Sequence, residues 1–303
     1  MKILVTGAAG FIGGWGVREL SAAGYEVAGT DLRDAEGFTQ ADLTNQDEVR
    51  DLFAKTRPTV VIHLAAISGS TGKNEAEQSL RQPLENFRVN ALGTANLCEV
   101  ARKTDVKRIV YMSSFALYGR TSKDRLPITP TTSLSLEHAY ANSKYMGELV
   151  LRTYSHDFGL KSVIFRAPFV SGEHQRERSV LMEFIASAVQ GKDLVIFGRG
   201  EHVREFVHPI DIVDAFKRAL PHMEESKEPC ETFVLGNTPI QIKDLARLVI
   251  QKVGKGKVKH LEQAVDRAFD QFSDYGKATQ YLGWKPTFTV SQIVDRIIAS
   301  DFR

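Results

Sequence analysis

A glycine-rich turn near the start of the chain constrains the fold more than any other stretch. The apolar run Ile3–Val5 leads directly into Thr-Gly-Ala-Ala-Gly-Phe-Ile-Gly at residues 6–13. A strand that delivers glycines to the start of a helix lets backbone N–H groups approach a pyrophosphate, and the helix N-terminus adds partial positive charge. The turn therefore predicts a dinucleotide site. Its predicted cofactor-binding residues are Gly7, Gly10, Phe11, Ile12 and Gly13.

The spacing of these glycines leaves a second interpretation open. The common dinucleotide fingerprint has its first two glycines two residues apart, whereas Gly7, Gly10 and Gly13 lie three apart. A turn that joins a strand to a helix and binds nothing would have the same composition. The residues that follow in the chain distinguish a dinucleotide site from a turn without a ligand.

Apolar runs and helical patterns alternate through the first half of the chain. Strands are predicted at 3–6, 26–30, 59–64, 108–112 and 162–166, and helices at 13–23, 46–55, 83–103 and 140–158. This alternation is typical of parallel strands joined by right-handed crossovers, with helices on both faces of the sheet. The predicted fold class is α/β, a Rossmann-like doubly wound parallel sheet with a smaller C-terminal α/β substrate domain. We expect an NAD-binding domain at 1–170, to which 205–236 returns, and a substrate-binding domain at 171–303.

Charge and cysteine content exclude several classes of partner. The 303 residues carry a formal charge of +2, which gives no field for nucleic acid or an anionic membrane surface. No apolar stretch approaches the roughly 20 residues of a membrane span, and Met1-Lys2 runs straight into the first strand, without a signal peptide. Cys98 and Cys230 lack the spacing of a zinc site or a disulfide framework. We expect a cytoplasmic protein with a small-molecule partner and no metal.

An acidic residue ends the second predicted strand. Asp31 lies 18 residues after Gly13, where a carboxylate can accept hydrogen bonds from the ribose hydroxyls and repel a 2′-phosphate. This position favours NAD over NADP, although Arg33 keeps some tolerance of NADP open, and a surface aspartate without a ligand is the alternative. Five residues at the ends of later segments are placed where they can line the adenine and ribose. They are Asp42, Leu43, Leu64, Ala65 and Ala66.

Two further pairs carry the chemistry. Ser113 and Ser114 directly follow the strand predicted at 108–112, and Tyr140 and Lys144 share one face of the following helix because they are four residues apart. A free phenol has a pKa near 10, and a neighbouring ammonium favours the phenolate, so such a tyrosine can accept a proton near neutrality. Each pair by itself is common on protein surfaces. Their order in the chain gives them weight.

Together these motifs resemble the extended short-chain dehydrogenase/reductase family, and within it the NAD-dependent epimerase/dehydratase branch that includes UDP-glucose 4-epimerase. The match runs from Lys2 to Pro286. The residues that carry it are Gly7, Gly10, Gly13, Asp31, Asp42, Leu43, Asn90, Ser114, Tyr140 and Lys144. The family uses the three-residue glycine spacing found here, so the resemblance favours a dinucleotide site over an empty turn.

The resemblance implies a role for each catalytic residue. Tyr140 corresponds to the general base and acid, Lys144 to the ribose-binding residue that lowers the tyrosine pKa, and Ser114 to the hydroxyl that bonds the reacting oxygen. Asn90 corresponds to a cofactor-binding position. Phe115 and Ala116 stand where sugar 4,6-dehydratases carry an Asp-Glu pair, so elimination of water is not expected.

The second half resembles the substrate domain of the family. There Phe197 falls near the base-binding position, Arg204 matches an arginine that clamps the diphosphate of a sugar nucleotide, and Arg267 is a candidate second phosphate ligand. The alternative for Arg204 is a strand-edge residue paired with a carboxylate such as Glu201. Some other polar residues are assigned structural roles. Asp211 is expected to cap a helix at 212–220, and His63, His138 and His208 are expected to be structural.

Three functions remain open on the sequence. The first is an NAD-dependent sugar-nucleotide epimerase, acting at C4 through a transient keto sugar. The second is an NAD(P)-dependent dehydrogenase or reductase of a sugar or sugar acid, and the third is a non-catalytic NAD-binding regulatory protein. The polar loop at 69–77 is expected to border the sugar. The resemblance also implies a homodimer in which the helices at 83–103 and 140–158 form an intersubunit four-helix bundle.

Overall fold

A seven-stranded sheet forms the centre of the computed structural model, which describes residues 1–67, 83–175, 179–262 and 269–302. The strand order is β11-β6-β5-β4-β1-β2-β3, and every neighbouring pair is parallel. The strands are β1 (Lys2–Thr6), β2 (Glu26–Asp31), β3 (Thr39–Gln40), β4 (Val60–His63), β5 (Arg108–Ser114), β6 (Lys161–Ala167) and β11 (Cys230–Val234). This confirms the predicted α/β class. The strand order reverses between β1 and β4, where such sheets bind their ligands.

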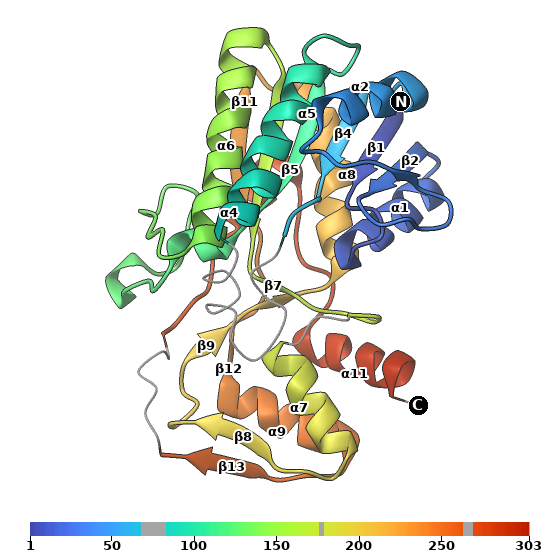
Figure 1. The fold of residues 1–303 in the computed structure, drawn as a ribbon. Helices are drawn as coiled ribbons and strands as arrows, with labels where there is room; N and C mark the ends of the chain where they lie inside the picture. Colours follow the sequence, from blue (N-terminus) through green and yellow to red (C-terminus); the bar gives the residue numbers. More distant parts are fainter. Residues whose placement is uncertain (68–82, 176–178, 263–268, 303) are drawn as a thin grey trace.

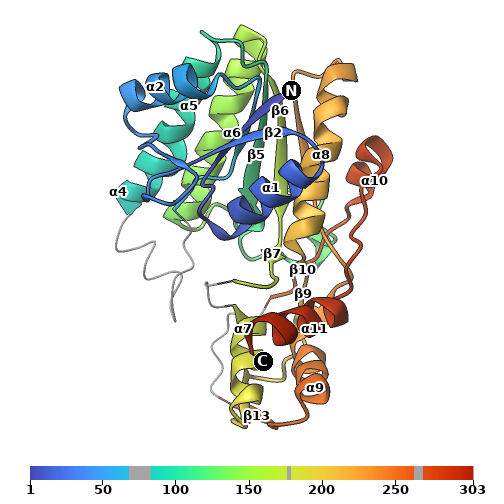
Figure 2. The same ribbon diagram turned by 90° about the vertical axis from the view of Figure 1, so that its right-hand side faces the viewer.

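Helices cover both faces of the sheet, as Figure 2 shows with the sheet nearly edge-on. One face carries α1 (Phe11–Ala22) and α8 (Pro209–Glu225), and the other carries α2 (Gln46–Thr56), α5 (Gly93–Ala101) and α6 (Ala139–Phe158). Successive strand residues point to opposite faces. Accordingly, Ile3 and Val5 of β1 join the core beneath α1 and α8, while Leu4 joins the core beneath α2, α5 and α6.

The helical stretch predicted at 83–103 is helical but not a regular α-helix. It comprises α4 (Pro83–Asn86), the π-helical segment η1 (Phe87–Leu92) and α5. A π segment widens the helix locally and is often found beside functional sites. Here the widened turn contains Asn90.

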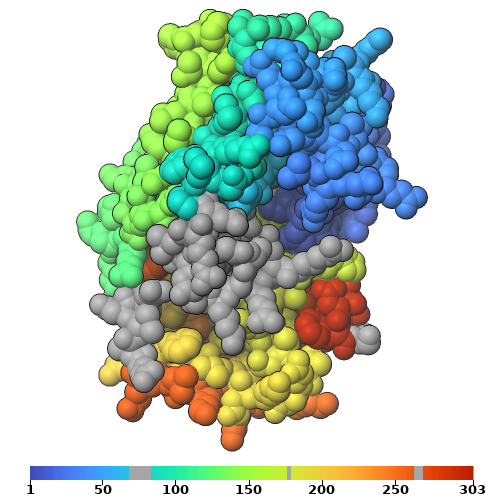
Figure 3. Space-filling view, in the orientation of Figure 1, coloured from blue at the N-terminus to red at the C-terminus, as the bar shows by residue number. Residues whose placement is uncertain are grey.

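Several elements of the C-terminal half gather in a second, smaller lobe beneath the carboxyl edge of the sheet (Figure 1 and Figure 3). Its elements are α7 (Val180–Val189), β8 (Leu194–Phe197), β9 (Val203–Arg204), β12 (Ile240–Gln241), α9 (Ile242–Val253), β13 (Val258–Leu261) and α11 (Val290–Asp301). The lobe has its own buried core, which includes Leu181, Ile185, Leu245 and Ile293.

Short elements complete the described fold. They are η2 (Phe115–Tyr118), η3 (Lys123–Arg125), β7 (Phe169–Val170), β10 (Phe206–Val207) and α10 (Gly276–Leu282). Strand β10 pairs in parallel with β7, while α10 packs beside α8 on the larger lobe (Figure 2). The chain therefore crosses between the lobes more than once.

The prediction that Asp211 caps a helix beginning at residue 212 is wrong. Helix α8 begins at Pro209, and its N-cap is His208, whose Nδ1 accepts a hydrogen bond from the Ile210 N–H at 3.1 Å. Proline suits the first helical turn because its fixed φ is helical and the N–H it lacks would have no helical partner. The Asp211 carboxylate instead accepts hydrogen bonds from the backbone of Thr287 and Phe288. None of the helices in the described ranges has the length and apolarity to cross a membrane.

Candidate active site

The glycine turn folds tightly between the end of β1 and the first turn of α1. Gly7 has a φ of +69°, and a Cβ atom there would lie 2.8 Å from the Ala65 nitrogen. A Cβ atom at Gly13 would lie only 2.0 Å from the Gly7 carbonyl oxygen. The backbone can take this path only with glycine at both positions. Such bare backbone next to a helix N-terminus is what a pyrophosphate site requires.

A chain of buried hydrogen bonds locks the ends of β1 and β4 together. The Thr6 hydroxyl donates to His63 Nδ1 at 2.7 Å, in the tautomer that lets His63 Nε2 donate to Thr94 Oγ1 at 3.0 Å. Thr94 in turn donates to the Asn90 carbonyl oxygen at 2.6 Å. Burial, and secondarily the Lys144 ammonium, lower the pKa of His63 to about 3, so the ring stays neutral. His63 therefore has a structural role in the described part of the site.

The same threonine positions part of the predicted cofactor lining. Thr6 Oγ1 accepts hydrogen bonds from the backbone N–H groups of Leu64 and Ala65, at 3.2 and 3.1 Å. These two residues thereby lie against Gly7, and Ala66 follows them. Leu43 is buried, whereas Asp42 is half-buried and lies 3.9 Å from Arg88.

Asp31 lies against the glycine turn, at the carboxyl end of β2. Its Oδ2 accepts from the Ala9 N–H at 3.0 Å, and its Oδ1 accepts from the Arg33 N–H and Nε, each at 3.1 Å. Burial by itself would raise the pKa of Asp31, but the bonds and charge of Arg33, together with the Ala9 bond, hold it below the ordinary value. The carboxylate is thus charged at neutral pH, and Arg33 is already engaged by it.

Asn90 uses both of its amide donors within the protein. Its Nδ2 donates to the Ile67 carbonyl oxygen at 3.1 Å and to Ser143 Oγ at 2.9 Å, while its Oδ1 accepts from the Ile67 N–H at 2.8 Å. Asn90 therefore joins the chain after β4 to helix α6. Its partners are structural ones.

Strand β5 and helix α6 carry the predicted catalytic residues. Ser114 ends β5, and its Oγ accepts a hydrogen bond from the Ala116 N–H at 3.1 Å. Tyr140 lies in the first turn of α6, beside the N-cap His138, with 6.3 Å between their ring centroids. Lys144 lies one turn further along and is 2 % exposed. The carboxyl edge of the sheet thus brings a hydroxyl, a phenol and an ammonium to one side of the larger lobe.

The surroundings of Lys144 explain its electrostatics. Its Nζ lies 4.1 Å from the centroid of the Tyr111 ring, and the Tyr111 hydroxyl donates to the Lys144 carbonyl oxygen at 3.3 Å. Burial lowers the pKa of Lys144 to about 7, even though the neighbouring Glu148 carboxylate works in the opposite direction. At neutral pH the charged and the neutral form of Lys144 are therefore present in similar amounts.

The predicted substrate residues lie in the smaller lobe. Phe197 ends β8, and it is 56 % exposed to solvent. The Arg204 guanidinium lies 4.6 Å from the centroid of the Phe269 ring, and its Nη1 donates to the carbonyl oxygens of Val203 and Phe269. Burial lowers the pKa of Arg204 to about 10, so it remains a cation near neutrality.

Glu201 pairs with Lys243, at 3.7 Å, rather than with Arg204. Arg267 and the loop at 69–77 lie outside the described residues. Within the described ranges, no group of three His, Cys, Asp or Glu side chains could together hold a metal ion.

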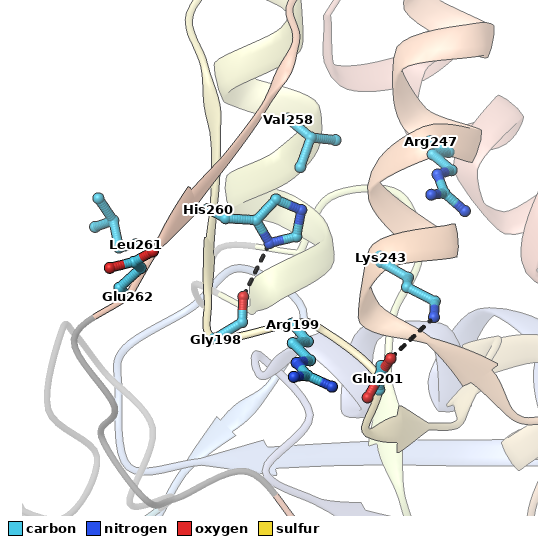
Figure 4. A pocket seen from close by; sticks show the side chains of 9 residues that line it. All are labelled: Gly198, Arg199, Glu201, Lys243, Arg247, Val258, His260, Leu261 and Glu262. Carbon is cyan, nitrogen blue, oxygen red and sulfur yellow. Dashed lines mark hydrogen bonds and ion pairs between the residues drawn. The ribbon is translucent and has the colours of Figure 1, made fainter.

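A separate hollow of about 610 Å³ lies at the end of β8 and β13 (Figure 4). Lys243 and Arg247 enter it from α9, opposite His260, whose Nδ1 lies 2.9 Å from the Gly198 carbonyl oxygen. Because none of the predicted catalytic residues lines it, this hollow is not the reaction site.

The structure contains a buried ion pair near the site, Glu148 with Arg166, that the sequence analysis did not predict. Glu148 lies on α6, four residues after Lys144, and its carboxylate binds Arg166 of β6 and the Ser113 hydroxyl. The four-residue spacing is a helix-face signal that the sequence does contain. Arg166 has no comparable signal, because its partner is 18 residues away on another element.

Comparison with known proteins gives one consistent answer. A model of the NAD dependent epimerase/dehydratase family matches residues 3–236. The UDP-glucose 4-epimerase of Streptococcus mutans is 32 % identical over 99 % of this chain and 95 % of its own length. Among solved structures, the UDP-glucose 4-epimerase of Thermotoga maritima with UDP-glucose has a TM-score of 0.84 at 27 % identity, covering 99 % of this chain and 98 % of its own. The Thermus thermophilus enzyme in complex with NAD has a TM-score of 0.83 at 27 % identity, with the same coverage of both chains.

Proposed function

Because the chain belongs to the NAD dependent epimerase/dehydratase family, we propose that it interconverts the C4 epimers of a UDP-sugar. It is an NAD-dependent epimerase of the extended short-chain dehydrogenase/reductase type. The observation that carries the assignment is the buried Lys144 one turn after Tyr140 on α6, with Ser114 at the end of β5, which packs against α6. An NAD-binding regulatory protein would need the glycine turn but not this acid–base set.

The residues of the turn fit NAD. Because Gly7 and Gly13 carry no side chains, a pyrophosphate can approach the N-terminus of α1 closely, and the charged Asp31 carboxylate suits ribose hydroxyls. Gly10, Phe11 and Ile12 complete the turn, while Leu43, Leu64, Ala65 and Ala66, with Asp42, would line the adenosine. We assign Asn90 a positioning role, since both of its amide donors bind within the protein.

Tyr140 is the group that moves the proton. When bound, NAD supplies the reversible oxidation of the sugar carbon. Tyr140 accepts the proton of the C4 hydroxyl and returns it to the opposite epimer, so no net proton is released. Ser114 bonds the reacting oxygen, and the Lys144 ammonium holds the ribose and favours the tyrosinate.

The smaller lobe would bind the nucleotide half of the substrate. Arg204 remains cationic at neutral pH and has a planar fork suited to phosphate oxygens, so it is assigned the diphosphate. We assign the exposed Phe197 to the nucleotide base, and we propose Arg267 as a second ligand of the diphosphate. In this scheme 1–170 with 205–236 form the cofactor domain, and the remainder of 171–303 forms the substrate domain. The pairing of β11 with β6 supports the return of the chain to the larger lobe.

A substrate screen tests the proposal. The purified protein is incubated with UDP-, GDP- and dTDP-sugars and with free uronic acids, and both NADH absorbance and product stereochemistry are followed. Epimerisation of a UDP-sugar without net NADH is expected, because the cofactor is restored in each cycle. Stoichiometric NADH with an oxidised product would establish a dehydrogenase instead.

Replacing Asp31 by alanine is expected to weaken NAD binding more than NADP binding. Hydrogen bonds to a charged group contribute about 1.5–3 kcal/mol, so the ratio of the two affinities should fall by roughly 10- to 150-fold. Isothermal titration with both dinucleotides measures the ratio. The same measurement on Asp34→Ala, a change on the exposed loop that follows, serves as control. An unchanged ratio in Asp31→Ala would remove Asp31 from the ribose site.

We further propose a homodimer built on α4, η1, α5 and α6. Large apolar side chains are exposed on these elements: Leu84, Leu92, Met146, Leu149 and Phe158. Apolar residues gathered on neighbouring exposed helices are typical of subunit contacts. Light scattering at micromolar concentration is expected to give twice the chain mass of 33.7 kDa, and Leu149→Glu to reduce it to one chain. Tyr281→Glu, an equally exposed site on α10, should remain dimeric, and a monomeric wild-type protein contradicts the proposal.

A further inference from the structure

Glu148 is the most enclosed acidic side chain behind the catalytic face of α6. It is fully buried, and Arg166 binds it with two bonds, Nε to Oε1 at 2.9 Å and Nη2 to Oε2 at 2.6 Å. The Ser113 hydroxyl donates to Oε1 at 2.6 Å. A buried carboxylate that lost these partners would be strongly destabilising. Glu148 therefore fixes the relative positions of α6, β5 and β6.

The ion pair extends to the loop after β5. Arg166 Nη1 donates to the Tyr118 hydroxyl at 3.0 Å and to the Pro130 carbonyl oxygen at 3.2 Å. The Tyr118 hydroxyl donates to the Thr129 carbonyl oxygen at 2.9 Å. Ser114 lies between Ser113 and η2, so both of its flanks are held by side chains that contact Glu148 or Arg166.

The Glu148 carboxylate also places a negative charge near Lys144. The two residues are one helical turn apart, which brings side chains within about 5–6 Å at their Cβ atoms. The other titratable groups around Lys144 in the described residues are His63 on β4, Tyr111 on β5 and Tyr140 on α6. Burial keeps His63 neutral, with a pKa of about 3, and raises the pKa of Tyr111 well above its usual value. Neither His63 nor Tyr111 can therefore balance an ammonium near neutral pH.

We propose that Glu148 is a positioning residue of the active site, whose carboxylate favours the ammonium form of Lys144 and, through Ser113 and Arg166, holds the strand end that carries Ser114. The proposal rests on the proposed function only for the role of Lys144. Arg166 opposes Glu148 electrostatically, because it is a second buried cation that shares the same carboxylate. Removing the Glu148 charge should therefore disfavour the Lys144 ammonium, and more strongly when Arg166 is kept than when it is removed as well.

The sign follows from the charge of each variant. Glu148→Gln removes the anion and leaves Arg166, so the ammonium of Lys144 is disfavoured and its pKa falls. The double variant Glu148→Gln/Arg166→Met removes both charges, so the Lys144 pKa falls by less than in Glu148→Gln. Because the ammonium is the working form, activity lost on raising the pH should be lost earlier in both variants, and earliest in Glu148→Gln. An opposite charge within about 4–6 Å shifts a pKa by roughly 1–3 units, so displacements of about one pH unit are expected.

The test measures NAD affinity and kcat of the full chain as functions of pH, together with the melting temperature. For Glu148→Gln the alkaline decline should move to lower pH, and for the double variant Glu148→Gln/Arg166→Met it should move in the same direction by less. Ser113→Ala keeps both charges but loses a bond to the strand end, so its kcat is expected to fall without displacement of the pH profile. If Glu148→Gln does not fold, the double variant Glu148→Gln/Arg166→Met removes both buried charges, and its decline should still lie below that of the wild type.

The outcomes separate positioning from mere stabilisation. If the variants melt at lower temperature but keep the wild-type pH profiles, Glu148 is only structural and the proposal is overturned. Displacement of the alkaline decline to higher pH in either variant overturns it as well. The NAD-binding profile is measurable without any substrate. A protein that binds NAD with the expected displacements but epimerises nothing would refute the proposed function while supporting the role of Glu148.

Discussion

Replacement of Tyr140 by phenylalanine is expected to lower kcat by roughly 10²–10⁴-fold, the usual contribution of a positioned proton-transfer group. The ring and its place in the first turn of α6 are retained, and only the hydroxyl that exchanges the proton is lost. Binding of NAD should change little, because the glycine turn, Asp31 and Lys144 are intact. Steady-state epimerisation and equilibrium titration with NAD measure the two quantities separately.

Tyr145→Phe is the matched control for this variant. Tyr145 lies on the same helix, five residues after Tyr140 and therefore on a different face, and it undergoes the same chemical change. We expect it to retain the wild-type kcat. If Tyr140→Phe also turned over at a near-normal rate, another group would have to move the proton, and the assignment of Tyr140 would fail.

Gly13→Ala is expected to remove most of the affinity for NAD. The added Cβ atom would lie 2.0 Å from the Gly7 carbonyl oxygen, so the backbone of the turn must move. Overpacking of this kind costs about 1–3 kcal/mol, which is roughly a 5- to 150-fold loss of affinity if the cost falls on the bound state. Titration with NAD measures the loss, and thermal melting reports how much of the cost falls on folding.

The next residue offers a close control. A Cβ atom at Gly14 would lie 3.9 Å from its nearest neighbour, the Ala8 carbonyl oxygen, which is an ordinary contact. Gly14→Ala introduces the same methyl group into the same helix and should bind NAD as the wild type does. Equal affinities in the two variants would show that the turn does not hold the cofactor.

Much of the larger lobe could be predicted from the sequence, because its signals are local. The strands predicted at 3–6, 26–30 and 108–112 match β1, β2 and β5 to within two residues at each end. Alternation of these strands with helices predicted the parallel sheet. The resemblance to the family, and with it the cofactor, followed from the glycine turn and Asp31 taken together with Ser114, Tyr140 and Lys144, and the comparisons confirmed both.

Errors and omissions arose where a residue's partner is distant in sequence. Asp211 was assigned to a helix cap from its local context, but its carboxylate binds Thr287 and Phe288, 76 and 77 residues further along. The helical pattern at 83–103 gives no sign of the π segment that the structure shows at Asn90. The amide of Asn90 bridges Ile67 and Ser143, which lie on other elements.

The sequence by itself determined the fold class, which depends on periodicity. Its motifs identified the family and with it the cofactor, and they proposed the residues of the active site. The glycine turn was identifiable because its glycines and the start of the following helix lie within eight consecutive residues. Only the tertiary structure decided the electrostatic state of that site. The burial of Lys144 against Tyr111, and the Glu148–Arg166 pair behind it, depend on how β5, β6 and α6 pack. Desolvation and charge pairing act through space, and no local pattern encodes how much water a side chain will lose.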